Sequence, residues 1–522
     1  MTAPGGSAAN VDAELGAPEG VADAVAWATA ASDGLGLTDS ANAVRFARLY
    51  GEIARYLTDA ERWIFWCGER WELDTAGHHR ALALTLGVVR EIRREAEEAS
   101  DEPPEGGGDS PLVRLAKHAT ASESVARRAA TLRAAETLPE LQARLTDFDA
   151  NDRELVCGPD VVTLDRPAPR RPAVTTRPVS HVDRVTRTTR AHYRPEILVG
   201  PPPAQVADYL ATFLPDEERR RLLFKTLGSC LVGGNAQRLF IIIQGPSTTG
   251  KTQLVEALLE TLGPDYATAG SASVFRGNLD DRGRPDILKA VARRVAFFSE
   301  ASQAWELHGD RVKDLTGGGT ITARLFRENE YRDVRPAFTP VLVTNVLPRI
   351  VGADAALRRR MVVFDFTHTP LVEDPEIRDR FVRSPEVHEW LLARLITGYE
   401  EAARDGLADV IVAQGLTTMN AFDNLTHLGS FFRWLTDTDQ LTAVDTNAYG
   451  VKSTYVPLKS MYDRYALWVK DYGAQRDRAE KLNYDDFNAQ LRSSGWRSTK
   501  SGVHRWEGWR LSTLLSLYAS DA

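Results

Sequence analysis

The chain has 522 residues, more than one ordinary hydrophobic core accommodates, so about two to four domains are expected. The composition is that of a globular protein, 43% hydrophobic and 26% charged, and the net charge of −8 argues against a surface coated with nucleic acid. The three cysteines, Cys67, Cys157 and Cys230, have no paired spacing, which argues against a disulfide framework and against a zinc site.

The N-terminal segment, residues 1–38, is predicted to be disordered and acidic. Residues 1–40 contain six acidic residues and no lysine or arginine. This start lacks the basic residues of a signal peptide, and no apolar run in the chain approaches the length of a membrane span. We therefore expect a cytoplasmic protein, in a bacterial cell or a phage-infected host, without membrane contact.

Residues 39–198 are predicted to form a helical and α+β domain. Helical spacing begins near Ala41 and returns over 79–99 and 111–147. Trp63, Trp66 and Trp71 fall within nine residues and predict a small aromatic core or a hairpin. A short hairpin is expected over 156–164, followed by an extended connector over 167–178. Residues 166–190 contain seven arginines, which favour a solvated linker over a nucleic-acid contact.

A glycine-rich stretch at 245–252 reads GPSTTGKT and fits the phosphate-binding pattern G-x-x-x-x-G-K-[ST]. Its glycines allow backbone N–H groups to turn inward around phosphate oxygens. Lys251 is expected to reach the β- and γ-phosphates of ATP, and Thr252 to ligate Mg²⁺. The predicted nucleotide-binding residues are Gly245, Pro246, Ser247, Thr248, Thr249, Gly250, Lys251 and Thr252.

The surroundings of this stretch support that interpretation. The apolar run 239–243 precedes it and indicates a strand buried on both faces of a parallel sheet. Residues 252–262 follow at helical spacing, and Gly263 and Pro264 end the pattern. Strand, glycine loop and helix thus arrive in the order that places phosphate at a helix N-terminus, which disfavours a chance glycine turn.

Two later apolar strands end in polar residues suited to ATP hydrolysis. Residues 294–300 end in Glu300, which is a candidate for activating the attacking water and for helping to hold Mg²⁺. Residues 340–345 end in Asn345, which is a candidate for orienting that water near the γ-phosphate. Taken alone, each is more simply explained as a surface glutamate or a turn-forming asparagine.

Basic residues occur in two further places. Arg359 and Arg360 precede another apolar strand, and one of them is a candidate for an arginine that neutralises charge in the transition state, with a solvated basic turn as the alternative. Residues 312–327 suggest a tight glycine loop that leads into a hairpin. That segment offers Lys313, Arg324 and Arg327 to the phosphates of DNA.

Together these motifs resemble the superfamily 3 helicases, and in particular the helicase part of the phage and plasmid primase-helicases related to the poxvirus primase-helicase. The family order is present in 245–252, Ser299-Glu300, the LysAspLeuThrGlyGly segment 313–318, ThrAsnValLeuPro at 344–348, and Arg359-Arg360. The tryptophan cluster resembles the domain that precedes the ATPase in this family, and 458–468 with 487–495 resemble its C-terminal winged-helix-like module. The chain departs from the family in having Gly319-Thr320 after the paired glycines, and Arg358 where tryptophan is common.

The resemblance implies an α/β fold, with an AAA+-related P-loop ATPase core, a preceding helical and α+β domain, and a C-terminal winged-helix-like module. The expected boundaries are 39–198 for the preceding domain, 199–370 for the ATPase, 371–450 for a helical connector and 451–522 for the module. Residues 451–510 contain twelve lysines and arginines against seven acidic residues, which is compatible with DNA binding. About forty residues precede the helicase part, so a primase or initiator protein is expected to act in trans.

The resemblance further implies a ring, expected to be a hexamer, that hydrolyses ATP with Mg²⁺ to move along single-stranded DNA and open forked duplexes. Lys251, Glu300, Asn345, Arg359 and Arg360 are the expected catalytic residues. An ATP-switched DNA-binding, assembly or defence factor remains an alternative. A small-molecule kinase is a third reading, but it leaves the Asn345 strand and the arginine pair unexplained.

Overall fold

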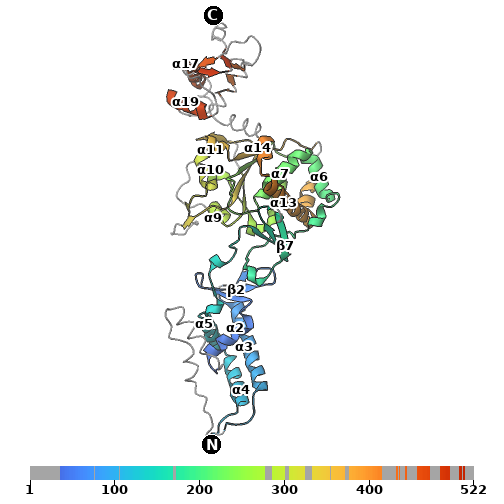
Figure 1. The fold of residues 1–522 in the computed structure, drawn as a ribbon, viewed down its shortest axis with the longest axis vertical. Helices are drawn as coiled ribbons and strands as arrows, with labels where there is room; N and C mark the ends of the chain where they lie inside the picture. Colours follow the sequence, from blue (N-terminus) through green and yellow to red (C-terminus); the bar gives the residue numbers. More distant parts are fainter. Residues whose placement is uncertain are drawn as a thin grey trace. The chain divides into compact units, whose positions relative to one another are not determined.

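The computed structural model describes residues 36–75, 77–104, 106–168, 172–276, 285–299, 305–323, 332–352, 354–370 and 375–413. Further along it describes 431–432, 434–435, 441–443, 455–470, 482–493, 505–507 and 509–511. The chain divides into two compact units. Figure 1 labels their helices and strands. Unit 1 comprises 1–151, 158–161 and 177–188, and unit 2 comprises 152–157, 162–176 and 189–522.

Four helices of unit 1 lie where helical spacing predicts them, but the prediction of helix over 111–147 is wrong beyond Ala135, where Pro139 begins a 3₁₀ turn and a short strand follows. The four helices are α2 (Asp39–Tyr50), α3 (His79–Glu98), α4 (Pro111–Ser122) and α5 (Val125–Ala135). The side chains of Thr38, Ser110 and Ser124 accept hydrogen bonds from first-turn amides and cap α2, α4 and α5. The short 3₁₀ helices η2 (Pro139–Leu141), η3 (Leu145–Asp147) and η4 (His181–Asp183) complete this unit.

The tryptophan cluster forms a hairpin that is also an aromatic core, so both forms of that prediction hold. β2 (Arg62–Trp66) pairs antiparallel with β3 (Trp71–Leu73) and with β1 (Ala54–Leu57), and β4 (Gln142–Ala143) adds to the β1 edge. Trp63 is fully buried and meets Phe46 of α2 edge to face, with ring centroids 5.4 Å apart. This contact ties the sheet to the helices.

The predicted hairpin at 156–164 is present as β5 (Glu154–Cys157) and β6 (Asp160–Leu164). The extended connector 167–178 ends in a paired strand, β7 (Val174–Pro178), which joins β5 and β6 in a three-stranded sheet. Sequence alone did not predict this pairing, because prolines and arginines dominate the segment and obscure any alternation of apolar residues.

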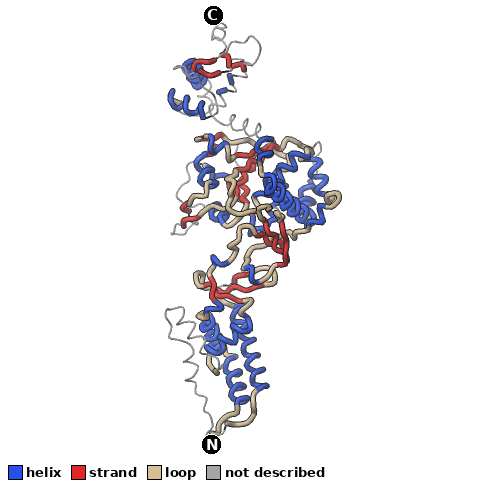
Figure 2. Tube along the Cα trace, viewed as in Figure 1, coloured by secondary structure: helices blue, strands red, loops and turns tan. Residues whose placement is uncertain are grey.

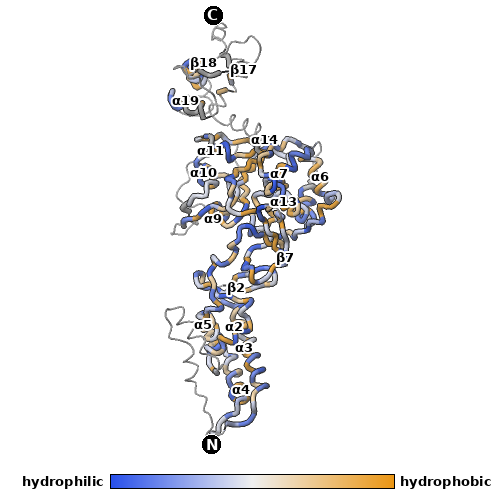
Figure 3. The backbone as a smooth tube through the Cα atoms, in the orientation of Figure 1, coloured by the Kyte–Doolittle hydropathy of each residue, from blue (hydrophilic) through white to orange (hydrophobic). Residues whose placement is uncertain are grey.

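Unit 2 is built on a five-stranded parallel sheet in the order β16, β8, β14, β10, β9. The strands are β8 (Phe240–Gln244), β9 (Ala267–Ser271), β10 (Val295–Ser299), β14 (Thr339–Thr344) and β16 (Met361–Asp365). On β8, Ile241 and Ile243 belong to one hydrophobic cluster, whereas Phe240 and Ile242 belong to another. The sheet is therefore covered on both faces, as its continuous apolar strands predict; Figure 3 shows the hydrophobic colour on these strands.

Helices of unit 2 lie on both sides of that sheet (Figure 2). One side carries α6 (Ala204–Phe213), α7 (Glu217–Ser229), α8 (Lys251–Tyr266), α12 (Pro375–Val382) and α13 (Pro385–Asp405). The other carries α9 (Pro285–Val291), α10 (Gly309–Thr316) and α11 (Ala355–Arg358), with η6 (Ala272–Phe275). Gly263 leaves helical geometry within α8, with φ 70°, where the sequence predicts the end of that helix.

Smaller elements complete unit 2. β11 (Glu306–His308) pairs parallel with β15 (Arg349–Val351), and β12 (Ile321–Ala323) pairs antiparallel with β13 (Arg332–Val334). η5 (Pro195–Leu198) and α14 (Ala408–Ala413) lie outside the sheet. Within the described part of the chain, no helix is both long and apolar enough to cross a bilayer.

The described C-terminal residues form a separate hydrophobic cluster. It contains α17 (Leu458–Trp468) and α19 (Tyr484–Ser493), with Tyr465 and Phe487 buried against Phe431. β17 (Leu441–Ala443) pairs antiparallel with β20 (Trp509–Leu511), and β18 (Tyr455–Pro457) with β19 (Arg505–Glu507). Helices with small antiparallel sheets are compatible with a winged-helix-like module, which stays a prediction.

A buried lysine joins three helices of unit 2. Lys225 of α7 is 0% exposed, and its Nζ lies 2.8 Å from each carboxylate oxygen of Asp409 in α14. Arg221 donates to Asp409 at 2.9 Å and to Glu401 of α13 at 3.1 Å. Because a buried ammonium requires a counter-charge, this network fixes α14 on α7.

We expect Asp409→Asn to lower the free energy of unfolding by about 2 kcal/mol, since it leaves the Lys225 ammonium without a carboxylate. Partial burial acts to raise the pKa of Asp409, but hydrogen bonds from Lys225 and Arg221 outweigh it and lower that pKa from 3.8 to about 2. The stabilisation is therefore complete above about pH 4 and is lost as the pH falls toward 2. Urea unfolding of both proteins at several pH values should show their difference shrinking over that range.

Candidate functional site

The carboxyl ends of three parallel strands bring the predicted site residues to one edge of the sheet. Gln244 of β8 is in register with Thr344 of β14, and Val343 of β14 with Ser299 of β10. The glycine loop therefore begins beside Asn345, which follows β14. Polar groups at this edge of a parallel sheet commonly form ligand sites. Glu300 follows β10 in sequence and lies outside the described residues.

The loop 245–252 takes a backbone path that requires its glycines. Gly245 has φ 150°, and a Cβ atom there would lie 2.0 Å from the carbonyl oxygen of Phe366. Gly250 has φ 82°, and a Cβ atom there would lie 2.6 Å from Cγ of Phe213. Thr248 also has a positive φ, 64°. With these turns the loop is compact and leads directly into the first turn of α8.

Lys251 lies along the inside of this loop and is only 5% exposed. Its Nζ donates to the carbonyl oxygens of Gly245 and Pro246, at 2.7 and 2.6 Å, and to Oγ1 of Thr249 at 3.0 Å. Burial lowers the pKa of Lys251. The ammonium is thus held within the loop, at the N-terminus of α8, where a helix also favours negative charge.

Asn345 is brought directly to the loop. Its Nδ2 donates to Oγ of Ser247 over 3.4 Å, a long hydrogen bond that joins segments about a hundred residues apart. The side chain of Asn345 is exposed, as are Pro246, Ser247 and Thr248. Thr252 is also exposed, in the first turn of α8. The loop and the asparagine therefore face solvent together.

Two aromatic residues of α6 pack against the loop from the protein interior. The sequence patterns did not predict a role for either. Tyr209 is fully buried, and its hydroxyl donates to the carbonyl of Gly250 at 2.9 Å. Its ring stacks on Phe381 of α12 with centroids 4.0 Å apart. Phe213 packs against Gly250. Their apolar spacing predicts only a buried helix face, so no local signal connects them with a loop some forty residues later.

The arginine pair lies at the amino ends of the strands, at the side of the sheet away from the glycine loop. Arg359 and Arg360 directly precede β16, and the carbonyl of Arg360 accepts a hydrogen bond from the amide of Phe240, the first residue of β8, at 2.7 Å. The glycine loop follows the other end of β8. The structure therefore does not bring these arginines to the loop of their own chain. Arg359 is exposed, whereas Arg360 is partly buried and donates to the carbonyl of Ala356 at 3.0 Å.

Lys313 corrects a detail of the prediction, because it lies in helix α10 rather than in a glycine loop. Its Nζ pairs with Asp310 at 2.7 Å and with Asp354 at 3.0 Å, and these hydrogen bonds raise the pKa of Lys313. The predicted hairpin follows as β12 and β13. Arg324 and Arg327 fall between those strands, outside the described residues.

Comparison with known proteins gives matches to proteins named as helicases and primases. The family description "D5 N terminal like" fits residues 43–217. A protein named "Putative helicase" from Acanthamoeba polyphaga mimivirus is 29% identical over 186 residues, 35% of this chain and 19% of that protein. A second, from Frog virus 3, is 25% identical over 173 residues, 32% of this chain and 18% of that protein. A protein named "Putative primase" from African swine fever virus is 20% identical over 289 residues, which are 52% of this chain and 29% of that protein.

The matched relatives are named as helicases and primases, so the chain is similar to proteins of the primase-helicase kind over these segments. The chain spans less than a third of the length of each of these relatives. Among solved structures, the apo form of the NrS-1 C-terminal region aligns with a TM-score of 0.40 at 11% identity, covering 88% of this chain and 97% of that one.

Proposed function

We propose that this chain is an ATP-dependent DNA helicase of superfamily 3, which acts in the replication of phage, viral or plasmid DNA. One observation carries the proposal: the glycine loop that holds the buried Lys251 at a helix N-terminus is contacted at Ser247 by Asn345, which follows the neighbouring strand. That arrangement offers a positive charge and backbone amides to phosphate oxygens, and a polar amide to water near them.

The residues present fit ATP with Mg²⁺. The positive-φ turns at Gly245, Thr248 and Gly250 leave room for phosphate where side chains would collide. Lys251 would exchange its contacts with the loop carbonyls for phosphate oxygens, and the exposed Thr252 hydroxyl would contribute to holding the metal ion with Glu300. The bound metal supplies charge neutralisation on the phosphates.

Assembly into a ring, expected to be a hexamer, is supported by the placement of the arginine pair. Arg359 and Arg360 precede β16, at the edge of the sheet away from the loop of their own chain. An arginine there can reach a transferring phosphoryl group only in a neighbouring subunit. Arg324 and Arg327 remain the proposed contacts to the DNA backbone, whereas the ion pairs of Lys313 with Asp310 and Asp354 favour a structural role for that lysine.

The tyrosine beneath the loop leads to a prediction about nucleotide affinity. Tyr209→Phe is expected to raise the KM for ATP about fivefold, because the Gly250 carbonyl loses a hydrogen bond worth about 1 kcal/mol and the loop is held less firmly. Steady-state kinetics measure the effect, with the unfolding midpoint as control. A KM equal to that of the wild type would mean that Tyr209 serves packing alone.

The decisive experiment is strand separation on a forked DNA duplex with ATP and Mg²⁺, beside ATP turnover with and without single-stranded DNA. Unwinding that stops when ATP is withheld or Mg²⁺ is chelated supports the proposal. Turnover that DNA stimulates without strand separation indicates instead an ATP-switched DNA-binding or assembly factor. Turnover that DNA does not change contradicts the helicase function.

A further inference from the structure

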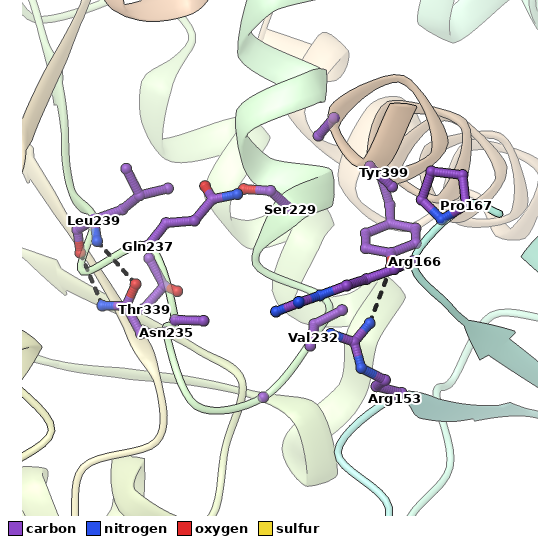
Figure 4. Close-up of a pocket in the computed structure, with 14 residues that line it drawn as sticks. Arg153, Arg166, Pro167, Ser229, Val232, Asn235, Gln237, Leu239, Thr339 and Tyr399 are labelled. Atoms are coloured by element: carbon purple, nitrogen blue, oxygen red, sulfur yellow. Dashed lines mark hydrogen bonds between the residues drawn. The ribbon is translucent and has the colours of Figure 1, made fainter. Parts of the chain in front are cut away.

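A cavity in unit 2 lies away from the glycine loop (Figure 4). Its volume is about 510 Å³, within the range of small-molecule sites in proteins. Leu239 and Thr339 line it, and they lie at the amino ends of β8 and β14. Because the glycine loop follows the carboxyl end of β8, the two sites are at opposite edges of the sheet.

The charge of this cavity has one sign. Arg153 and Arg166 contribute guanidinium groups, and none of the residues that line it is acidic. Asp152 and Asp165 precede these arginines in sequence but are not part of the lining. An anion entering the cavity would therefore meet two guanidinium groups in the lining, while the Asp152 carboxylate lies beside Gly233 and that of Asp165 near Tyr399.

Arg153 is held in place by its neighbours. Its guanidinium donates to the carbonyl of Leu164 at 2.9 Å and to the hydroxyl of Tyr399 at 3.4 Å. The Tyr399 hydroxyl also lies 2.9 Å from the Leu164 carbonyl and 2.7 Å from the Asp165 carbonyl. This network fixes the wall of the cavity from which Arg153 projects. A side chain that is already fixed loses less conformational entropy when a ligand binds.

Arg166 is available to a ligand. No hydrogen bond or ion pair to its guanidinium occurs among the residues that the structure describes. Figure 4 shows its side chain extending across the cavity from beside Tyr399 toward the side where Asn235 and Gln237 lie. Gln237 is exposed and lies on the loop before β8, so its amide adds a donor and an acceptor opposite the arginine.

We propose that this cavity binds a nucleoside phosphate, either free or as one unit of a single DNA strand. Guanidinium groups recognise phosphate through paired hydrogen bonds, which two arginines in one cavity can supply. The volume accommodates a nucleotide, and Gln237 can pair with polar groups of a sugar or base. The site is separate from the proposed ATP site and does not depend on ATP hydrolysis.

Binding measured in a Lys251→Ala background tests the proposal, since that change weakens nucleotide binding at the glycine loop. The probes are thymidine 5′-monophosphate, a thymidine oligonucleotide, and thymidine as the ligand without phosphate. Arg166→Gln is expected to weaken phosphate-containing probes about tenfold, and thymidine is expected not to bind. Arg238→Gln is the matched control, because Arg238 is an exposed arginine next to Gln237 that does not line the cavity.

The pattern of losses identifies the source of the phosphate. A tenfold loss for the monophosphate assigns the cavity to free nucleotides, and a loss confined to the oligonucleotide assigns it to a DNA strand. Equal affinities in Arg166→Gln and Arg238→Gln for both probes would overturn the proposal. An unchanged unfolding midpoint for Arg166→Gln shows that any loss is local, as expected for an exposed side chain.

Discussion

Replacing Lys251 with alanine is expected to reduce ATP turnover by about a hundredfold to a thousandfold, the typical effect of removing a preorganised positive group from a reacting centre. Lys251 is 5% exposed and already lies inside the loop, and 245–252 contains no other basic residue. Its Nζ is within 3.0 Å of three loop oxygens, all of which phosphate would displace. The loss should therefore appear in kcat as well as in nucleotide affinity.

Lys289→Ala serves as the control for this change, because Lys289 is an exposed lysine of α9 in the same unit. It is expected to turn over ATP at the wild-type rate. Phosphate release with purified protein measures both variants, and circular dichroism checks that both remain folded. Turnover in Lys251→Ala within threefold of the wild type would exclude the glycine loop as the site of hydrolysis.

Gly398→Ala is expected to destabilise unit 2 by about 3 kcal/mol or more, although alanine is intrinsically the better helix former by about 1 kcal/mol. Helices α7 and α13 cross at backbone contact, where a Cβ atom on Gly398 would lie 2.3 Å from the carbonyl oxygen of Phe224. Gly228 faces the same crossing, with the Leu395 carbonyl oxygen 2.3 Å from a Cβ atom built there. Backbone atoms cannot rotate away as a side chain can, so the helices must separate.

Denaturant unfolding measures this effect, and Gly319→Ala is its control, since a Cβ atom there meets nothing within 4 Å. Once Gly398→Ala has separated the helices, adding Gly228→Ala should cost less than it does alone. Independent, additive losses would show that the two glycines do not share one contact. A stabilised Gly398→Ala variant would contradict the close crossing of α7 and α13.

Local sequence patterns predicted the elements around the glycine loop because each depends on near neighbours. The apolar run 239–243 became β8, and the helix begins at Lys251. Gly263 leaves helical geometry because glycine reaches positive φ without a steric cost. The same holds for the hairpin at Trp63 to Trp71, where β-forming aromatic residues flank a short turn.

Other features depend on contacts that no local pattern contains. Lys313 lies in a helix because Val312 and Leu315 pack into the core that covers the sheet, and its ammonium then pairs with Asp354, 41 residues later in the chain. The helices of 375–405, expected as part of a connector, share the core of the sheet through the α7 and α13 crossing. Glu300, Arg324 and Arg327 remain predictions.

By itself, the sequence determined the strand, loop and helix at 239–262, because apolar periodicity and glycine geometry act over a few residues. Only the tertiary structure decided that Asn345 lies beside this loop, that Arg359 and Arg360 lie at the other edge of the sheet, and that Tyr209 supports Gly250. Those relations follow from the order and direction of the parallel strands. The packing of the whole sheet selects that order, and it depends on residues that are far apart in the chain.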